Sequence, residues 1–555
     1  MLATLLAVVF GLGLGTPLPV MPSVSSINGS LEITVILERA ILAINGVTLK
    51  TRVFNQTIPG PTIRVRPGDE MKIRFQNLLV DQGSAYVHNQ FSAADESNLH
   101  FHGLHVSGEL PSDDSMVPVL PGEERVYMTL LPQDHMPGTH WLHPHRHGST
   151  ALQLAGGAAA ALIVEDAPGT LPAQVEGAPE VILVVMQIDL ETTARIASRA
   201  RDSWFSSSGG RLTTLVNGEV APTIGVRGGE WTRFRIVYAG WLAEVLNFDI
   251  SGCEKALLAK DGIYIRDFPR MLSGYAPIPV GGRADLMVRC MAPHTEYQVT
   301  WGAERIATVS TGELIPSSLD LEAWSPRYPA YLEDLQTTET SPDCSCVTEL
   351  EGRTVNGHLF EEDFILHESY LGAVVERAIT ARSHPYHQHV YPFQLMSGFE
   401  NNDRRDNDNR NNNNNIGTSA GNYDLPGDWH DTIEGQGVVR YKPAAFTGKV
   451  MLHCHRLDHE DEGMMSIELV KDSGPCVCRS PSLLPTWAII IIVVVLLLVL
   501  GPIIILSYHR WRYGSWAFCP SSRARNVSPT QEHTEDQPSI LGCRTPEDAG
   551  EVRKS

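Results

Sequence analysis

Histidine pairs two residues apart are the feature of this sequence that is most able to carry out chemistry. The chain has 555 residues and 21 histidines, and random placement would give roughly 0.8 pairs at positions i and i+2. Five such pairs occur in two blocks: His100/His102, His143/His145, His145/His147, His387/His389 and His453/His455. Residues two apart in a strand project from the same face, so each pair can aim two imidazoles into one space. The pattern predicts metal sites, and imidazole suits copper, zinc, iron or nickel.

A single cysteine among these histidines indicates which metal is bound. The candidate ligands are one thiolate, two imidazoles and a weak thioether, from Cys454, His384, His459 and Met464. This set is typical of blue-copper sites, whereas structural zinc sites prefer two or more cysteines. In an alternating strand Cys454 faces away from both neighbouring histidines. One segment can therefore contact a copper that accepts electrons on one face and a second metal group on the other.

Four segments resemble, in order and spacing, the copper signatures of the multicopper oxidases, a family that includes laccases, ascorbate oxidases, bilirubin oxidases and metallo-oxidases. They are Asn98-Leu-His-Phe-His-Gly-Leu-His105, Gly138-Thr-His-Trp-Leu-His-Pro-His145, His384-Pro-Tyr-His-Gln-His389 and His453-Cys-His-Arg-Leu-Asp-His459. The resemblance covers roughly residues 50–470. It implies an all-β fold of three cupredoxin-like Greek-key β-sandwich domains, with a trinuclear copper cluster between the first and the third.

The resemblance also implies a role for each matching residue. Four copper ions would be bound: one of type 1, one of type 2 and a type 3 pair. The type 1 ligands would be His384, Cys454, His459 and axial Met464, the type 2 ligands His100 and His387, and the type 3 ligands His102, His143, His145, His389, His453 and His455. Glu460, directly after His459, and Asp113, which lies next to Asp114, match acids that supply protons. The predicted catalytic residues are therefore Cys454, Glu460 and Asp113.

The expected reaction couples a reducing substrate to dioxygen. Electrons would enter at the type 1 copper and pass through Cys454 to His453 and His455, and dioxygen would be reduced to water. We expect a laccase-like enzyme that oxidises phenols or amines at an apolar pocket. One alternative is a ferroxidase or metallo-oxidase that binds Fe(II) or Cu(I) through carboxylates, with a possible partner permease; another is a non-catalytic copper-binding surface protein. The 14 methionines are spread along the chain and form no Met-rich insertion, which lowers the Cu(I) alternative.

An internal repeat predicts how these segments are arranged. Pro61-Thr-Ile-Arg-Val-Arg-Pro-Gly-Asp69 recurs as Pro222-Thr-Ile-Gly-Val-Arg-Gly-Gly-Glu230, each a few residues after an asparagine, and a degraded third copy begins at Val355-Asn-Gly357. Alternating apolar segments between Gly and Pro residues predict strands and an all-β fold. The expected domains are residues 29–168, 175–315, which lacks copper ligands, and 350–472. Residues 316–349 form a linker, and the Asn-rich tract 401–415 is a solvated loop insertion.

Two apolar runs predict the compartment. Residues 1–20 are typical of a signal peptide, and residues 487–508 form an uncharged run that is long enough for a transmembrane helix. Four arginines follow this run closely, which places the tail 509–555 in the cytosol as a disordered segment. We expect a single-pass type I membrane protein whose catalytic domains are extracellular or luminal. The net charge of −21 argues against nucleic acid as a partner.

The remaining cysteines and histidines leave alternatives open. Six cysteines, at positions 253, 290, 344, 346, 476 and 478, could form disulfides in an oxidising lumen, with 15 possible arrangements. Asn28-Gly-Ser30 and Asn55-Gln-Thr57 match the glycosylation pattern. His105, His140 and His147 lie beside ligands and either orient them or are structural. No role is assigned to His88, His135, His294, His358, His367 and His430.

Overall fold

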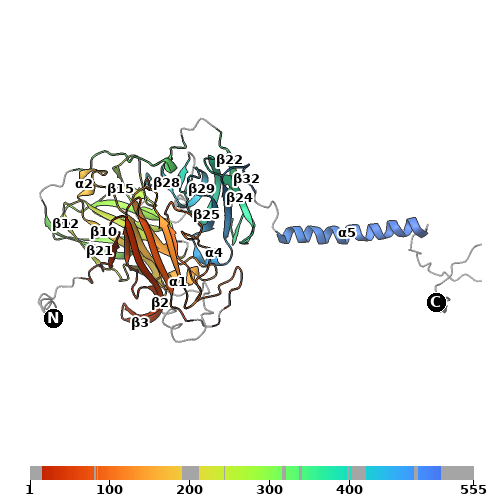
Figure 1. The fold of residues 1–555 in the computed structure, drawn as a ribbon, viewed down its shortest axis with the longest axis horizontal. Coiled ribbons are helices and arrows are strands. Elements are labelled where there is room, and N and C mark those ends of the chain that lie inside the picture. The colour runs from red at the N-terminus through yellow and green to blue at the C-terminus, as the bar shows by residue number, and fades with distance from the viewer. Residues whose placement is uncertain are drawn as a thin grey trace, which may run out of the picture. The chain divides into compact units, whose positions relative to one another are not determined.

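The computed structural model describes residues 15–80, 83, 85–190, 212–242, 244–315, 320–336, 341–396, 400–401, 421–479 and 486–513 (Figure 1). Residues 1–14 of the predicted signal peptide, 402–415 of the Asn-rich insertion, 514–555 of the predicted tail and parts of the linker lie outside the described residues. The chain forms two compact units, one up to Leu483 and one from Leu484 onward. The first unit is built almost wholly of strands, so the predicted all-β fold is confirmed.

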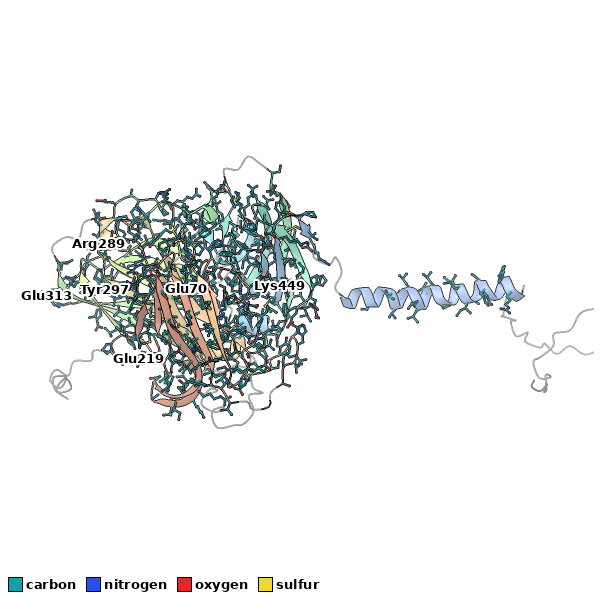
Figure 2. The ribbon with its side chains drawn as sticks, viewed as in Figure 1. Glu70, Glu219, Arg289, Tyr297, Glu313 and Lys449 are labelled. Carbon is teal, nitrogen blue, oxygen red and sulfur yellow. A yellow bond between two sulfur atoms is a disulfide. The ribbon has the colours of Figure 1, made fainter. Side chains whose placement is uncertain are left out.

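The sheets of the first unit fall into three groups along the chain. The first group has two sheets with a shared apolar core between them. One sheet has the order β1 (Ser23–Ser25), β4 (Thr62–Val65), β9 (Ala160–Val164), β8 (Gly138–His143) and β6 (His100–His102). The other has the order β3 (Val47–Phe54), β2 (Ser30–Ile44), β5 (Glu70–Asn77) and β7 (Glu124–Leu130). In β5 the apolar side chains are buried and Glu70 faces outward, as the alternation predicts (Figure 2).

The second group also has two sheets, and none of the predicted metal ligands lies in it. Its larger sheet contains β11 (Thr213–Val216), β10 (Glu180–Ile188), β13 (Thr232–Tyr238), β19 (Arg283–Arg289), β15 (Glu254–Lys260), β16 (Ile263–Tyr264) and β17 (Arg270–Met271). The other contains β12 (Thr223–Gly228), β21 (Glu304–Leu314), β20 (Glu296–Trp301), β14 (Leu246–Ile250) and β18 (Ala276–Ile278). Exposed charged side chains such as Glu313 lie on its surface (Figure 2).

The third group is one continuous set of strands around its own apolar core. Its strands are β28 (Trp429–His430), β26 (Phe393–Leu395), β29 (Thr432–Tyr441), β25 (Val375–Gln388), β30 (Gly448–Cys454), β31 (Met465–Lys471), β24 (Ile365–Tyr370), β32 (Val477–Cys478), β22 (Cys344–Glu351), β23 (Thr354–Val355) and β27 (Glu400–Asn401). The register of β25 shifts between Ala381 and Tyr386, and its second arm pairs with β30. This bend brings two segments with predicted ligands side by side. The predicted domain boundaries themselves stay predictions, because the three groups form one compact unit.

The three groups repeat one pairing scheme. An early strand lies parallel to a later central strand in each group: β2 with β5, β10 with β13 and β22 with β25. A second strand lies parallel to a strand near the end of the group: β4 with β9, β12 with β21 and β24 with β31. The sequence repeat at Pro61 and Pro222 therefore marks equivalent positions in a shared topology.

An asparagine in a left-handed turn recurs at the same place in each group. Asn55, Asn217 and Asn356 have φ angles of 50°, 52° and 52°. Each side-chain oxygen accepts a backbone N–H and each amide nitrogen donates to a backbone carbonyl two residues earlier in the same strand: Ile36 and Thr34, Val184 and Ile182, and Glu349 and Val347. Asparagine suits this position because it tolerates positive φ and bonds the backbone. The glycosylation pattern at Asn55 thus involves an amide that is already hydrogen-bonded within the fold, whereas Asn28 is exposed.

Disulfides and the N-terminal segment tie distant parts of the first unit together. Three disulfides join Cys253 to Cys290, Cys344 to Cys476 and Cys346 to Cys478, which confirms that these cysteines pair. Leu18 N donates to Thr223 O, and β1 pairs with β4. A cleavage that keeps the contact of Leu18 with the second group must therefore occur before residue 18, within the predicted signal peptide 1–20.

The described part of the second unit is one helix, α5 (Thr486–Tyr513), with Pro502 inside it. Among the residues whose side chains the structure describes, we find no helix that is both long and apolar enough to cross a bilayer. The transmembrane helix predicted at residues 487–508 is therefore not supported by the structure.

The asparagine turns generate a prediction about stability. Asn356 is fully buried, and Asn356→Gly would keep the positive φ angle but remove three side-chain hydrogen bonds, the third being the one that the amide nitrogen donates to Arg479 O at 3.0 Å. Leaving buried backbone groups unpaired costs about 1–3 kcal/mol. We expect the free energy of unfolding, measured by denaturant titration, to fall by about 2 kcal/mol. The matched control is Asn28→Gly, at an exposed asparagine with a φ of 54°. Equal effects of the two substitutions would contradict the role of the side-chain bonds.

Candidate metal centres

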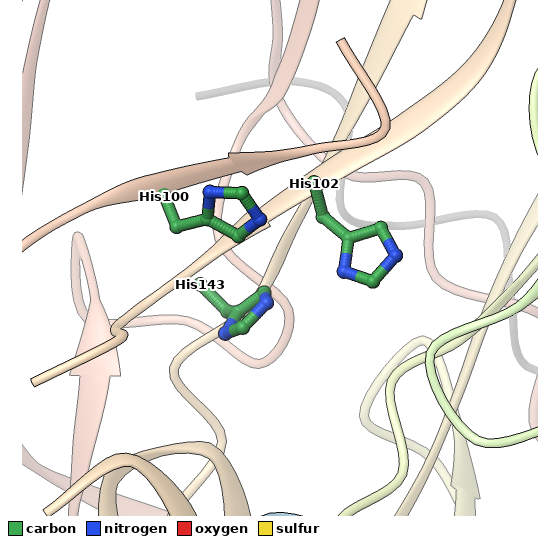
Figure 3. Close-up of side chains that lie close together, drawn as sticks. All are labelled: His100, His102 and His143. Atoms are coloured by element: carbon green, nitrogen blue, oxygen red, sulfur yellow. The ribbon is translucent and has the colours of Figure 1, made fainter. Parts of the chain in front are cut away.

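Eight histidines from the first and third groups meet in one buried cluster. Strands β6 and β8 pair so that His100 lies opposite His143, and β25 and β30 pair so that His387 lies opposite His453. Figure 3 shows the rings of His100, His102 and His143 turned toward one another. The eight side chains are at most 4% exposed: His100, His102, His143, His145, His387, His389, His453 and His455.

The two halves of the cluster interlock closely. The His100 ring stacks on His389 with centroids 3.9 Å apart, and the His102 ring stacks on His387 at 3.8 Å. The Nε2 atom of His453 lies 3.3 Å from that of His145 and 3.2 Å from that of His389. Each half therefore supplies nitrogen atoms to the same space.

Several ring nitrogens of this cluster have no hydrogen bond within the described part of the chain. Among the described residues, buried and unpartnered atoms include His100 Nε2, His102 Nδ1, His143 Nε2, His387 Nε2 and both ring nitrogens of His455. The opposite nitrogens are held: His100 Nδ1 by Asp113 Oδ2 at 2.9 Å, His143 Nδ1 by Pro144 O at 2.8 Å, and His387 Nδ1 by Asp431 O at 2.9 Å. A buried polar atom without a partner costs about 1–3 kcal/mol. A group of unpaired ring nitrogens in one buried space is typical of a metal site. In such sites the second nitrogen of each histidine is held by a hydrogen bond, as it is here for His100, His143 and His387.

Burial also sets the protonation state of these imidazoles. It lowers the pKa of His100 and of His143 well below the usual value, and the neighbouring imidazoles, His145 first, lower it further. Burial lowers the pKa of His145 to about 3. The rings of His100, His143 and His145 are therefore neutral at physiological pH, which is the form that binds a metal.

A second, smaller cluster lies on the opposite face of β30. Cys454 Sγ is 3.6 Å from His384 Nδ1 and 4.0 Å from His459 Nδ1, and the two Nδ1 atoms are 3.0 Å apart. Burial raises the pKa of the Cys454 thiol well above its usual value. One sulfur and two imidazole nitrogens at this separation form the trigonal donor set of a blue-copper site. Cys454 is the one free cysteine of the described residues.

Met464 lies next to this cluster in the fold. It is fully buried, its N–H donates to His459 O at 2.8 Å, and its carbonyl accepts from Cys454 N at 3.1 Å. The backbone of Met464 therefore connects the two ends of the segment that carries the cluster. The role of its sulfur as an axial ligand stays a prediction.

The two predicted acids both touch histidines of the large cluster. Asp113 Oδ2 contacts His100 Nδ1, and its Oδ1 accepts from Phe101 N at 2.9 Å. Glu460 Oε2 lies 3.3 Å from His453 Nδ1, and its Oε1 lies 3.5 Å from His145 Nδ1. Burial raises the pKa of both carboxyl groups well above the usual values. Each can therefore hold a proton next to the cluster.

Asp461, which was not predicted, fixes Glu460 in place. It lies in the short helix α4 (Leu457–Asp461), which packs against α1 (Thr150–Ala155) of the first group. Its carboxylate accepts the backbone N–H of Gly148 at 2.7 Å and of Ala151 at 2.9 Å. Burial raises the pKa of Asp461 to about 7, against the effect of these hydrogen bonds. The spacing of residues in the sequence could not predict this contact, because Gly148 and Ala151 belong to the first group of strands and Asp461 to the third.

The second group also contributes to the cluster surroundings. Arg283 donates to Asp431 Oδ1 at 2.7 Å, and Asp431 lies 3.5 Å from His102 Nε2 and 3.6 Å from His387 Nδ1. Burial opposes ionisation of Asp431, but Arg283 lowers its pKa well below the usual value. A histidine count could not reveal Arg283 or Asp431, because neither belongs to a His-x-His pair.

The other histidines near the motifs lie outside both clusters. His105 stacks on Tyr331 at 4.0 Å, and its Nδ1 contacts Val390 O. His147 Nε2 contacts Asn89 Oδ1 at 3.0 Å. His430 lies between Asp261 and Asp424, which raise its pKa although burial works to lower it. These residues support the fold around the clusters.

Comparison with known proteins agrees with this geometry. Residues 38–169 and 332–473 each match a family model described as multicopper oxidase. A multicopper oxidase of Staphylococcus haemolyticus is 24% identical over 425 residues, which cover 74% of this chain and 82% of that protein. Laccase-1 of Thanatephorus cucumeris is 24% identical over 272 residues, which cover 46% of this chain and 44% of that protein.

Solved structures show the same fold. A multicopper oxidase from Campylobacter jejuni, described as a metallo-oxidase, has a TM-score of 0.63 and 20% identity, with 83% of this chain and 96% of that chain covered. A laccase from Pediococcus acidilactici has a TM-score of 0.63 and 22% identity, with 82% of this chain and 94% of that chain covered. The two matching family models and the curated relatives show that the chain belongs to the multicopper oxidase family of copper-dependent oxidoreductases.

Proposed function

We propose that this chain is a laccase-like oxidase with four copper ions, which couples one-electron oxidation of phenols or amines to reduction of dioxygen to water. The observation that carries the proposal is the position of Cys454. Its sulfur meets His384 and His459 on one face of β30, while its neighbours His453 and His455 join the eight-histidine cluster. Two donor sets are thus linked by a single residue, as an electron-transfer enzyme requires.

The ligand roles follow from the two donor sets. His384, Cys454 and His459, with Met464, would hold a type 1 copper. Within the large cluster, His100 and His387 would hold a type 2 copper, and the type 3 pair would be held by His102, His143, His145, His389, His453 and His455. When bound, copper supplies one-electron oxidation of the substrate and four-electron reduction of dioxygen. A chain that kept copper only for binding would not need both sets, which argues against the non-catalytic alternative.

Protons for water formation come from the buried acids. Glu460 bridges His145 and His453, and Asp113 holds His100. Both carboxyl groups are buried and have raised pKa values, so they keep a proton to higher pH than exposed carboxyl groups do. A positioned acid of this kind contributes about 10²–10⁴-fold to a rate.

The surroundings of the smaller cluster support an organic substrate. Asp458 lies 3.9 Å from His459 Nε2 but is bound by Arg456 at 2.7 Å, and Glu462 is bound by Arg353. These arginines help to lower the pKa of His384 to about 4, after burial, which is the larger cause. Carboxylates paired with guanidinium groups attract a metal cation less than free ones do.

A metal-ion substrate is the second candidate. The net charge of −21 favours cations near the surface, and a structural neighbour from Campylobacter jejuni is described as a metallo-oxidase. A ferroxidase of this kind would act on Fe(II) or Cu(I), and a permease would be its expected partner.

We also propose that the enzyme is a single-pass type I membrane protein with an extracellular or luminal active unit. The support is in the sequence: no charged residue lies between Arg479 and His509, and arginines cluster after that run. Residues 1–20 would act as the signal peptide, and residues 509–555 would lie in the cytosol.

The acids generate the first test. Glu460→Gln and Asp113→Asn should leave copper content and the blue absorbance unchanged while they slow oxygen uptake by about 10²-fold or more, because each removes a proton donor. Copper analysis, visible spectra and an oxygen electrode supply the measurements. Unchanged turnover would remove these residues from the proton path.

The substrate class is tested by competition between candidates. Steady-state oxygen uptake with a phenol and with Fe(II), compared as kcat/KM, should favour the phenol. Arg456→Gln would free the Asp458 carboxylate and should shift the ratio toward Fe(II). A preference of the unaltered enzyme for iron by about a hundredfold, or about 2.7 kcal/mol of transition-state free energy, would reverse the order of the two candidates.

The membrane anchor is tested by extraction. Membranes from cells that make the full chain are washed with alkaline carbonate, and a variant that lacks residues 487–508 is treated in parallel. We expect the full chain to stay in the pellet and the shortened chain to appear in the soluble fraction. Release of the full chain by carbonate would show that residues 487–508 do not anchor it.

A further inference from the structure

Four cysteines and one histidine form a group that the oxidase sites do not use. Cys344 and Cys346 are alternate residues of β22, and Cys476 and Cys478 are alternate residues near and in β32. Alternate residues of a strand project from the same face. Each β22 cysteine is joined by a disulfide to one of the other pair. Two parallel cross-links therefore connect the same two short segments.

His367 belongs to the same group. It lies on β24 directly opposite Cys478 in the antiparallel pairing of β24 with β32. The side chain is fully buried, and its Nδ1 atom has no hydrogen-bond partner in the described part of the chain. Its Nε2 atom makes a long contact, 3.3 Å, with Thr348 Oγ1, and the backbone of Val347 and of Leu366 also interacts with the ring. An unpaired nitrogen buried beside sulfur atoms is costly unless it has a further role.

The possible donors of this group lie close together, and its two sulfurs are joined by a disulfide. One nitrogen of His367 lies within 4.8 Å of the sulfurs of Cys346 and Cys478. Donors around a tetrahedral zinc ion, with bonds of about 2.0–2.3 Å, lie roughly 4 Å apart. Once the disulfide is reduced, its two sulfurs must therefore move apart before they and His367 can surround one ion.

The chemistry of the donors selects a soft metal ion. Two thiolates and one imidazole suit Cu(I) and Zn(II). Burial, and after it Arg377, lowers the pKa of His367 to about 3, so the ring is neutral and able to bind a metal. Cys344 and Cys476, which form the neighbouring disulfide, could supply further sulfur donors after reduction.

We propose that, when its disulfides are reduced, this group binds one soft metal ion, Cu(I) or Zn(II), through Cys346, Cys478 and His367. The site is separate from the two donor sets of the oxidase, so the proposal does not depend on the proposed function. It assigns a role to His367 and to the doubled Cys-x-Cys pattern, which a single structural disulfide would not require.

The conversion is balanced by a dithiol reductant. Each disulfide takes up two electrons and two protons from one dithiol, which leaves as a disulfide. Attack is possible at Cys476 or Cys478, whose residues are partly exposed, whereas Cys344 and Cys346 are buried. The metal ion then displaces the protons of the Cys346 and Cys478 thiols and takes His367 as a third ligand. Metal coordination thus replaces the Cys346–Cys478 disulfide as the link between β22 and β32.

The test compares the oxidised and reduced forms of the full, copper-loaded protein. The chain is treated anaerobically with a phosphine reductant, freed of it by gel filtration, and given Cu(I) or Zn(II) in separate samples. Elemental analysis should show one additional ion per chain in the reduced form and none in the oxidised form. The two metal samples show which ion the site prefers. Absence of an additional ion in both reduced samples would overturn the proposal.

Substitutions locate the additional ion. His367→Gln should weaken its binding, measured by chelator competition, by at least tenfold, since even loss of an outer partner of a ligand costs about 10–100-fold. The matched control is His358→Gln, at an exposed histidine of the same group of strands. The double variant Cys253→Ser/Cys290→Ser should keep the additional ion, and Cys346→Ser/Cys478→Ser should lose it. Retention of the ion by the latter variant would contradict the site.

X-ray absorption at the zinc edge gives a readout that does not depend on variant folding. The additional ion in the reduced, unaltered chain should have sulfur neighbours together with an imidazole nitrogen. A coordination shell of oxygen and nitrogen alone would overturn the proposal.

Discussion

The structure depends on one constraint: eight imidazoles are buried together, and ring nitrogens of His100, His102, His143, His387 and His455 in this cluster have no hydrogen bond among the described residues. Such an arrangement is unfavourable for a protein without metal, because each buried unpaired nitrogen costs free energy. It becomes favourable when metal ions take those nitrogens as ligands. The first and third groups of strands each supply half of the cluster, so metal binding and the packing of these groups are coupled. This coupling also explains why the second nitrogen of a ring is held in place: His100 Nδ1 contacts the Asp113 carboxylate, and His387 Nδ1 contacts the backbone carbonyl of Asp431.

The contacts that hold the two halves together lie outside the cluster itself. Asp461 of α4 accepts backbone N–H groups at the start of α1, which sets Glu460 between His145 and His453. On the other side, Arg283 of the second group binds Asp431, beside His102 and His387. The second group holds no predicted ligand but still fixes the electrostatics of the site. A domain without metal ligands therefore has a direct structural role in the metal centre.

The repeated asparagine turn indicates that the groups with predicted ligands and the group without them share one strand topology. Asn55, Asn217 and Asn356 join equivalent strands in all three groups by the same two hydrogen bonds. Only the first and third groups add His-x-His pairs to this scaffold. The third group also has the paired disulfides and His367, which lie away from both oxidase donor sets. Chemistry has thus been added at different places on a shared strand topology.

The sequence by itself determined the all-β class and the family and predicted the candidate ligands, because these depend on spacing within single strands. Alternation along a strand alone places Cys454 on the other face from His453 and His455, and it places His100 and His102 on the same face. It could not determine the partners that come from distant segments. Arg283 and Asp431 are 148 residues apart, and Gly148 and Asp461 are 313 apart. The disulfide pairing among 15 arrangements was likewise open until the strands were placed. Such contacts are decided only when the chain folds, because local periodicity fixes which face a side chain takes but not which segment packs against that face.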